Sequence, residues 1–122
     1  MSEIRGKLFL VMFAEDEDCR ACDLRDAGWF VDAEYEDGGL AFRVIRQDPP
    51  DAVVIDLDHK PSHGREVARA LQNTRATRQI PVIGVGGTSD ARARLQAVVP
   101  TATFCSWEQL PDTLAGLIED HE

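Results

Sequence analysis

The 122-residue sequence has no long apolar segment and few basic residues for its number of acidic ones. No stretch approaches the roughly 20 apolar residues of a membrane-spanning helix, and residues 1–7 lack a signal peptide's long apolar centre, so we expect a cytoplasmic protein without a membrane partner. The net charge of −9 argues against nucleic-acid binding through phosphate contacts. Three cysteines, an odd number, argue against a disulfide framework.

The apolar pattern predicts five β-strands in a single domain that spans residues 1–122. Three continuous apolar runs, at residues 8–14, 52–55 and 80–85, are typical of strands buried on both faces of a parallel sheet. Residues 30–35 alternate between apolar and polar, and residues 102–107 are of mixed polarity, so these two segments are expected at the sheet edges.

Segments with helical spacing of apolar residues follow each predicted strand. The last two of them begin near the candidate N-caps Thr88, Ser89 and Asp90 and near Pro111. Strict alternation of strand and helix predicts an α/β fold: a single doubly wound, five-stranded parallel sheet with helices on both faces. Buried first, third and fourth strands fit the flavodoxin-like order 2-1-3-4-5.

Asp56 is the predicted centre of the protein's function, because it directly ends the predicted buried strand at residues 52–55. Parallel sheets place ligands and chemistry at the carboxyl ends of their strands. In the predicted order the first strand lies beside the third, so the acidic run Glu15–Asp18 should approach Asp56 and Asp58. Pro61 and Gly64 are expected to break the chain before the next helix begins.

The segment from Tyr35 to Ile83 resembles a receiver domain of two-component response regulators. The resemblance rests on a Glu-Asp-Gly turn at 36–38, a helix, an Asp-Pro-Pro-Asp-Ala-Val-Val-Ile-Asp segment that ends in Asp56, Gly64 eight residues later, and Gln-Ile-Pro-Val-Ile at 79–83. Residues 56–68 are also similar to a small atypical subgroup of stand-alone receiver-like proteins. The resemblance implies a signalling protein rather than an enzyme, with Asp56 as phosphoacceptor.

The same resemblance implies a magnesium ion, held by Glu15, Asp16 and Asp56 with the backbone of Asp58. Mg²⁺ suits one or two carboxylates together with phosphate oxygens and water. An ungapped count from Gly28 would instead place Met12 and Phe13 at the acidic pair; we prefer Glu15 and Asp16, since removing one helical turn keeps the buried face in register.

The implied partners are a sensor histidine kinase or another phosphodonor protein, and a downstream protein bound by a monomer or weak dimer.

Two departures from the receiver pattern concern residues that hold phosphoryl oxygens in that family. The expected switch Ser or Thr falls on Gly86, and Thr88 lies two residues further on. The usual Lys after the fifth strand is absent, since no Lys follows Lys60, and Ser106 or Cys105 takes its place. We consider Lys60 and Arg65, on the loop after Asp56, as auxiliary cations. Losing one charge-assisted bond costs about 1.5–3 kcal/mol.

Two alternatives stay open. The first is a pseudo-receiver, an interaction module whose partner binding ignores phosphorylation, which the missing Lys and hydroxyl favour. The second, more remote, is a thioredoxin-like redox protein that uses Cys19 and Cys22. Four acidic residues precede Cys19 and would raise a thiol pKa that a reactive cysteine needs lowered. We therefore expect both cysteines to line the buried side of a short helix.

Overall fold

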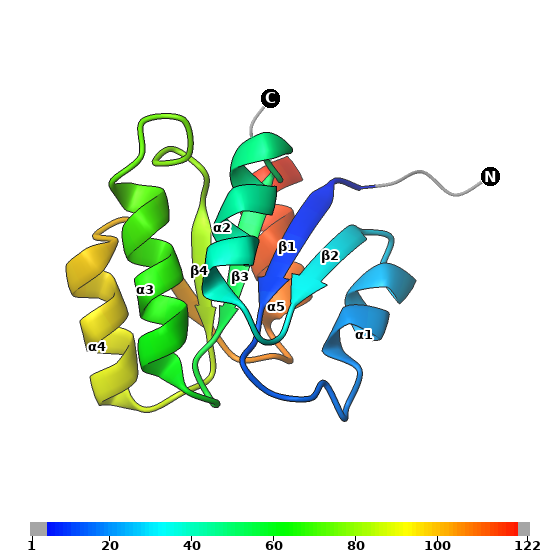
Figure 1. The fold of residues 1–122 in the computed structure, drawn as a ribbon. Coiled ribbons are helices and arrows are strands. Elements are labelled where there is room, and N and C mark those ends of the chain that lie inside the picture. Colours follow the sequence, from blue (N-terminus) through cyan, green and yellow to red (C-terminus); the bar gives the residue numbers. More distant parts are fainter. Residues whose placement is uncertain (1–4, 120–122) are drawn as a thin grey trace.

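The computed structural model describes residues 5–119, in which five parallel strands form one sheet in the order β2-β1-β3-β4-β5 (Figure 1). This is the predicted fold class and strand order. The strands are β1 Lys7–Val11, β2 Phe30–Glu34, β3 Ala52–Asp56, β4 Val82–Val85 and β5 Thr103–Cys105. β2 and β5 are the two edges, as their mixed polarity predicts.

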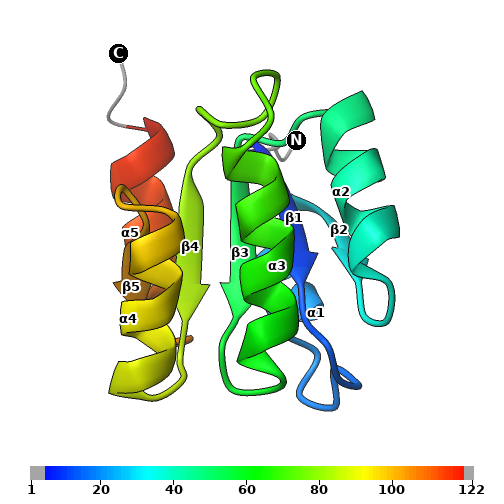
Figure 2. The same ribbon diagram turned by 60° about the vertical axis from the view of Figure 1, so that its left-hand side comes forward.

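Helices cover both faces of the sheet (Figures 1 and 2). α2, α3 and α4 pack over one apolar core cluster, and α1 and α5 over the other. The bounds are α1 Arg20–Asp26, α2 Gly38–Gln47, α3 Pro61–Gln72, α4 Ser89–Val98 and α5 Leu110–Leu114, which continues as the π-helix η1 Ala115–Glu119. Within the described part of the chain, no helix has both the length and the apolar character to cross a membrane.

The central strand β3 positions the candidate site. All five of its residues are buried, and it pairs with β1 and β4, with Val11 opposite Ile55 and Asp56 opposite Val85. Because all strands run in the same direction, their carboxyl ends meet at one edge of the sheet, the lower edge in Figure 2. The loops that follow β1, β3, β4 and β5 therefore meet beside Asp56.

Several predicted boundaries are wrong by one or more residues, and two of these errors lie close to the carboxyl edge of the sheet. β1 ends at Val11 rather than at residue 14, and Met12 and Phe13 leave the sheet but stay buried. α3 begins at Pro61, which fits the first turn of a helix because its missing N–H would be unpaired there. Gly64 therefore lies inside α3 rather than before it, and is buried against β3.

The predicted packing of the two cysteines is also wrong. In α1 the buried residues are Ala21 and Leu24, which lie three apart on one helix face. Cys22 projects from a neighbouring, exposed side of the helix, and Cys19 precedes the first helical residue. The two sulfur atoms form a disulfide across the start of α1.

Gly64 sets how closely α3 approaches β3, and we expect Gly64→Ala to destabilise the fold. An added Cβ would lie 2.6 Å from Ile55 Cγ2, and Ile55 is fully buried in the central strand. Overpacking of this kind costs about 1–3 kcal/mol, more than the roughly 1 kcal/mol that alanine gains over glycine in a helix. Urea denaturation should show a net loss in the free energy of unfolding of up to about 2 kcal/mol.

The control is Gly116→Ala in η1, where an added Cβ meets nothing within 4 Å. This variant should keep or slightly raise the free energy of unfolding. Equal stability of the two variants would contradict the proposed close contact between α3 and β3.

Candidate functional site

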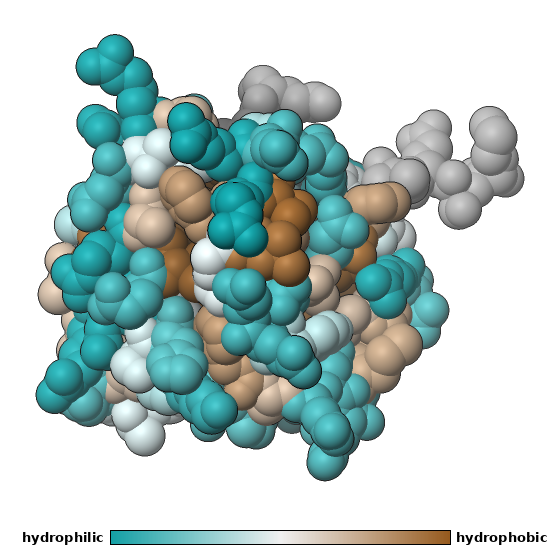
Figure 3. Space-filling view, in the orientation of Figure 1, coloured by the Kyte–Doolittle hydropathy of each residue, from teal (hydrophilic) through white to brown (hydrophobic). Residues whose placement is uncertain are grey.

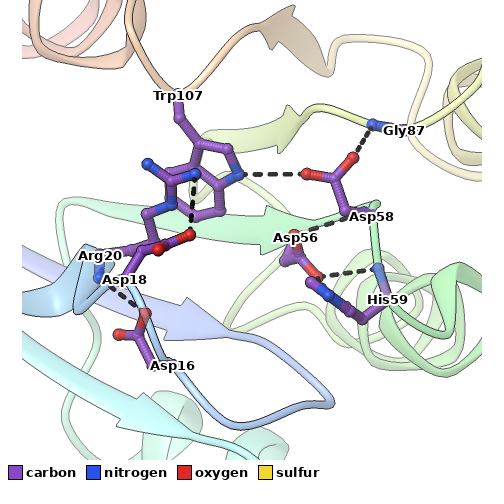
Figure 4. A network of polar contacts seen from close by, with 8 residues as sticks. All are labelled: Asp16, Asp18, Arg20, Asp56, Asp58, His59, Gly87 and Trp107. Carbon is purple, nitrogen blue, oxygen red and sulfur yellow. Dashed lines mark hydrogen bonds and ion pairs between the residues drawn. The ribbon is translucent and has the colours of Figure 1, made fainter.

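Asp56 carries a buried carboxylate at the carboxyl end of β3, with 0% of its side chain exposed. Its Oδ1 accepts a hydrogen bond from the backbone N–H of Asp58 at 3.3 Å, and its Oδ2 accepts one from that of His59 at 3.0 Å. The imidazole Nδ1 of His59 lies a further 3.0 Å from Oδ2 (Figure 4). Both carboxylate oxygens are therefore bonded by the loop that follows the strand.

Burial raises the pKa of Asp56 above its usual value. The hydrogen bonds from the His59 side chain and from the backbone of Asp58 and His59 act in the opposite direction but do not cancel the effect of desolvation. The carboxyl group therefore holds its proton to a higher pH in the folded protein than in an unfolded chain.

Asp58 lies outside the sheet and connects two other loops. Its Oδ1 accepts a hydrogen bond from Gly87 N at 2.8 Å, and its Oδ2 accepts one from the indole Nε1 of Trp107 at 3.3 Å. The guanidinium of Arg20 lies over the Trp107 ring, 5.0 Å from its centroid. As Figure 4 shows, this network joins the segments that follow β1, β3, β4 and β5.

The glycine pair after β4 leaves room for the Asp58 carboxylate. Gly86 and Gly87 have φ of +73° and +76°, a backbone region that side chains disfavour. A Cβ at Gly86 would lie 2.5 Å from Asp58 Oδ2, so the position of the expected switch hydroxyl has no room for a side chain. The Thr88 hydroxyl accepts a hydrogen bond from Ala91 N and so caps α4.

The acidic residues after β1 reach the same region by a loop. Met12 and Phe13 directly follow β1 at the position of the ungapped alternative, and both are buried. Glu15–Asp18, Asp56 and Asp58 nevertheless border one small cavity of about 80 Å³. The structure thus brings the predicted carboxylates together, although not at the end of the strand itself.

These carboxylates do not fit a magnesium ion in their present arrangement. Asp16 caps α1, where its oxygens accept hydrogen bonds from Arg20 N at 2.6 Å and Ala21 N at 3.0 Å. Asp56 and Asp58 are bonded as described above. Among residues 5–119, no three His, Cys, Asp or Glu side chains are grouped so that they could hold a metal ion. Three of the predicted ligands, Asp16, Asp56 and Asp58, instead accept hydrogen bonds from backbone and side-chain donors, whereas Glu15 only borders the cavity.

The predicted auxiliary residues lie away from the Asp56 cavity. Lys60 borders a separate cavity with Tyr35 and Cys19, whereas Arg65 lines a cavity between α3 and α4. The Ser106 hydroxyl accepts a hydrogen bond from Gln109 N, and so caps the turn before α5. None of the three lines the cavity beside Asp56.

Sequence reasoning missed three residues of this site: His59, Trp107 and Arg20. The His59 side chain is half exposed and contacts Asp56. A hydrogen-bonding side chain three residues after a buried strand-ending carboxylate is a usable signal, because a tight turn returns it to that carboxylate. Trp107 follows the fifth strand near the missing Lys and supplies an N–H donor there.

Solved structures similar to this chain are receiver domains. The chemotaxis response regulator CheY4 of Vibrio cholerae matches with a TM-score of 0.72 at 19% identity, over 96% of this chain and 99% of that one. The receiver domain of a signal transduction histidine kinase from Syntrophus aciditrophicus gives 0.75 at 18% identity, over 96% and 92%. The chain has the receiver-domain fold.

A third receiver domain, from the sensor histidine kinase PA1611 of Pseudomonas aeruginosa, gives a TM-score of 0.71 at 18% identity over 94% of this chain and 98% of that one. It is described with a magnesium ion coordinated in its active-site cleft. No protein-family model and no curated protein sequence matches the chain. The receiver fold, with its all-parallel sheet, gives no support to the thioredoxin-like alternative.

The pKa of Asp56 predicts how stability depends on pH. Because folding raises this pKa, protonation of Asp56 favours the folded state. This contribution to the free energy of unfolding is fully present below the unfolded-state pKa and is lost as the pH rises through the folded-state pKa. Asp56→Asn removes a buried charge, so at neutral pH the variant should be more stable than the wild type. Thermal unfolding across a pH series measures this difference, which should shrink as the pH falls.

Asp26→Asn, the same chemical change on an exposed residue of α1, is the control and should leave stability nearly unchanged at each pH. A wild type that is more stable than Asp56→Asn at neutral pH would show that the hydrogen bonds to the carboxylate outweigh its burial.

Proposed function

We propose that this chain is a receiver-fold signalling protein that acts through protein–protein contacts without phosphorylation of Asp56, the pseudo-receiver of the sequence analysis. The observation that carries the proposal is the position of the Asp58 carboxylate. It fills the space beside Gly86 where the switch hydroxyl is expected, and it already binds Gly87 and Trp107.

The surroundings of Asp56 disfavour phosphoryl transfer. The attacking oxygen of a carboxylate nucleophile must be accessible, and the transferring phosphoryl group needs nearby positive charge. Both Asp56 oxygens accept hydrogen bonds, and the side chain has no exposed surface. Arg20 is the one Lys or Arg that borders the cavity, and it stacks on Trp107 and pairs with Asp18 at 3.6 Å. A phosphoryl group would add a charge of about −1.5 to −2 beside several carboxylates.

Asp58 supports a fixed rather than a switched state. In receiver domains, as the resemblance implies, a lysine and a hydroxyl hold the phosphoryl oxygens. In this chain a carboxylate is already bonded to the loop after β4 and to the residue after β5. Because this anion is part of the chain, the contact does not depend on a phosphodonor, and the fold presents one surface to its partner.

Phosphorylation of Asp56 is the second candidate. It is favoured by the position of Asp56 at the carboxyl end of β3, on a cavity shared with Glu15–Asp18. In this case a sensor histidine kinase or another phosphodonor protein would supply the phosphoryl group, and the carboxylates would have to rearrange around Mg²⁺. The downstream protein partner, the cytoplasmic location and the non-enzymatic role belong to both candidates.

Treatment with MgCl₂ and beryllofluoride, or with acetyl phosphate, separates the two candidates. We expect no mass adduct and no change in the amide NMR signals of residues 56–59 or 86–88, because the Asp56 oxygens are occupied. A receiver domain that responds to beryllofluoride, treated in parallel, is the positive control. An adduct on the wild type that is absent from Asp56→Asn would overturn the proposal in favour of phosphorylation.

Asp58→Ala tests the network directly. It removes the acceptor for Gly87 N and Trp107 Nε1, so amide exchange at Gly87 should accelerate and the Trp107 indole NMR signal should move. Loss of two hydrogen bonds to a charged group should lower the free energy of unfolding by about 1–3 kcal/mol. The buried Trp29 indole, which has no hydrogen-bond partner, provides an internal reference signal that should stay in place.

Asp18→Ala is the matched control, because Asp18 is an exposed partner of Arg20 in the same region. An exposed ion pair is worth about 0–1 kcal/mol, so its loss should have little effect. If Asp58→Ala changed no more than Asp18→Ala, Asp58 would not hold the loops together.

A further inference from the structure

Charge is distributed unevenly along this acidic chain. Residues 59–107, which include α3 and α4, contain seven Lys or Arg against two Asp or Glu, a net charge of +5. The remaining residues contain six basic against twenty acidic side chains, a net charge of −14. α3 and α4 lie side by side on one face of the sheet, and hydrophilic side chains cover much of that face (Figure 3). The basic residues of the chain are therefore concentrated in the stretch that includes α3 and α4.

Three arginines meet at a cavity of about 440 Å³ between α3 and α4. Arg65 and Arg69 lie one helical turn apart on α3, and Arg94 projects from α4. The cavity is completed by Asn73, Ala97 and Val98. We call these six residues the arginine groove. Its short apolar wall and three guanidinium groups suit a ligand with carboxylates on an otherwise small backbone.

The guanidinium groups of the arginine groove are only partly used within the chain. Among residues 5–119, Arg65 makes no side-chain hydrogen bond or ion pair. Arg69 pairs with Glu66 at 3.5 Å and Arg94 with Asp90 at 2.9 Å, each through Nε and each within its own helix. Both pairs are well exposed, and exposed pairs of this kind contribute about 0–1 kcal/mol, so an incoming carboxylate can compete with them.

We propose that the arginine groove binds an acidic segment of a partner protein. Arginine binds carboxylates through two parallel hydrogen bonds, and three such groups in one groove recognise two or more acidic side chains of the same segment. A long nucleic acid is a poorer match, because its phosphates would run onto the acidic remainder of the molecule.

The groove is separate from the Asp56 cavity, and the two share no lining residue. The biological role of this binding rests on the proposed function, in which the chain acts through protein–protein contacts. Its own test is nevertheless independent: binding at the groove can fail while the Asp58 network holds, and the network can fail while binding holds.

Titration of the ¹⁵N-labelled chain with an acetylated hexaglutamate peptide tests the proposal. The largest shifts should fall on residues of the groove, and binding should weaken when about 0.3 M NaCl is added, because salt screens exposed charges. Arg65→Glu with Arg69→Glu should weaken binding at least about tenfold. Hexaglutamine, of the same length but uncharged, should not bind.

The matched control is Arg43→Glu with Arg46→Glu, which makes the same charge change on exposed residues of α2. It should change the affinity by less than about twofold. Equal weakening by both double variants would reduce the effect to overall charge and overturn the proposal.

Self-association tests another occupant of the groove, a second copy of the chain. If hexaglutamate does not bind, and Arg65→Glu with Arg69→Glu instead abolishes self-association seen by sedimentation, the acidic surface of a second copy fills the groove and the proposal fails.

Discussion

A parallel sheet gathers the loops at its carboxyl edge without bonding them to one another, so a bridge between them must come from the loops themselves. Asp58 makes that bridge here, since one carboxylate accepts hydrogen bonds from Gly87 and from Trp107. Arg20 extends the connection to the segment after β1 by stacking on the indole. Hydrogen bonds to a charged acceptor are worth about 1.5–3 kcal/mol, enough to select one arrangement of otherwise independent loops.

Two of the acidic residues around this bridge, Asp16 and Asp56, accept hydrogen bonds from donors within the chain. Backbone N–H groups at the start of α1 bind Asp16, and the turn after β3 binds Asp56. Most of the donors to Asp16 and Asp56 lie two to five residues away in sequence, whereas those to Asp58 lie far along the chain. This local arrangement explains how six acidic side chains border one small cavity without a grouping that fits a metal ion.

The strand order and the position of Asp56 were predictable from the sequence, because continuous apolar runs mark buried parallel strands and Asp56 directly ends one. Several details were not. Gly64 was expected to end a loop, because a glycine that permits close helix–strand packing looks the same in sequence as one that breaks a helix. The contact of His59 with Asp56, and that of Trp107 with Asp58, depend on loop geometry that has no periodic pattern.

The two glycines after β4 also restrict how this protein could evolve. A hydroxyl-bearing residue at position 86 would collide with the Asp58 carboxylate and would have to adopt a positive φ. Loss of Asp58 alone would remove the connection between the loops that follow β3, β4 and β5. Position 86 would still have no hydroxyl. A hydroxyl at position 86 would therefore require changes at both positions together, with either single change disfavoured. The contact between Asp58 and the glycine pair therefore disfavours single substitutions at either position.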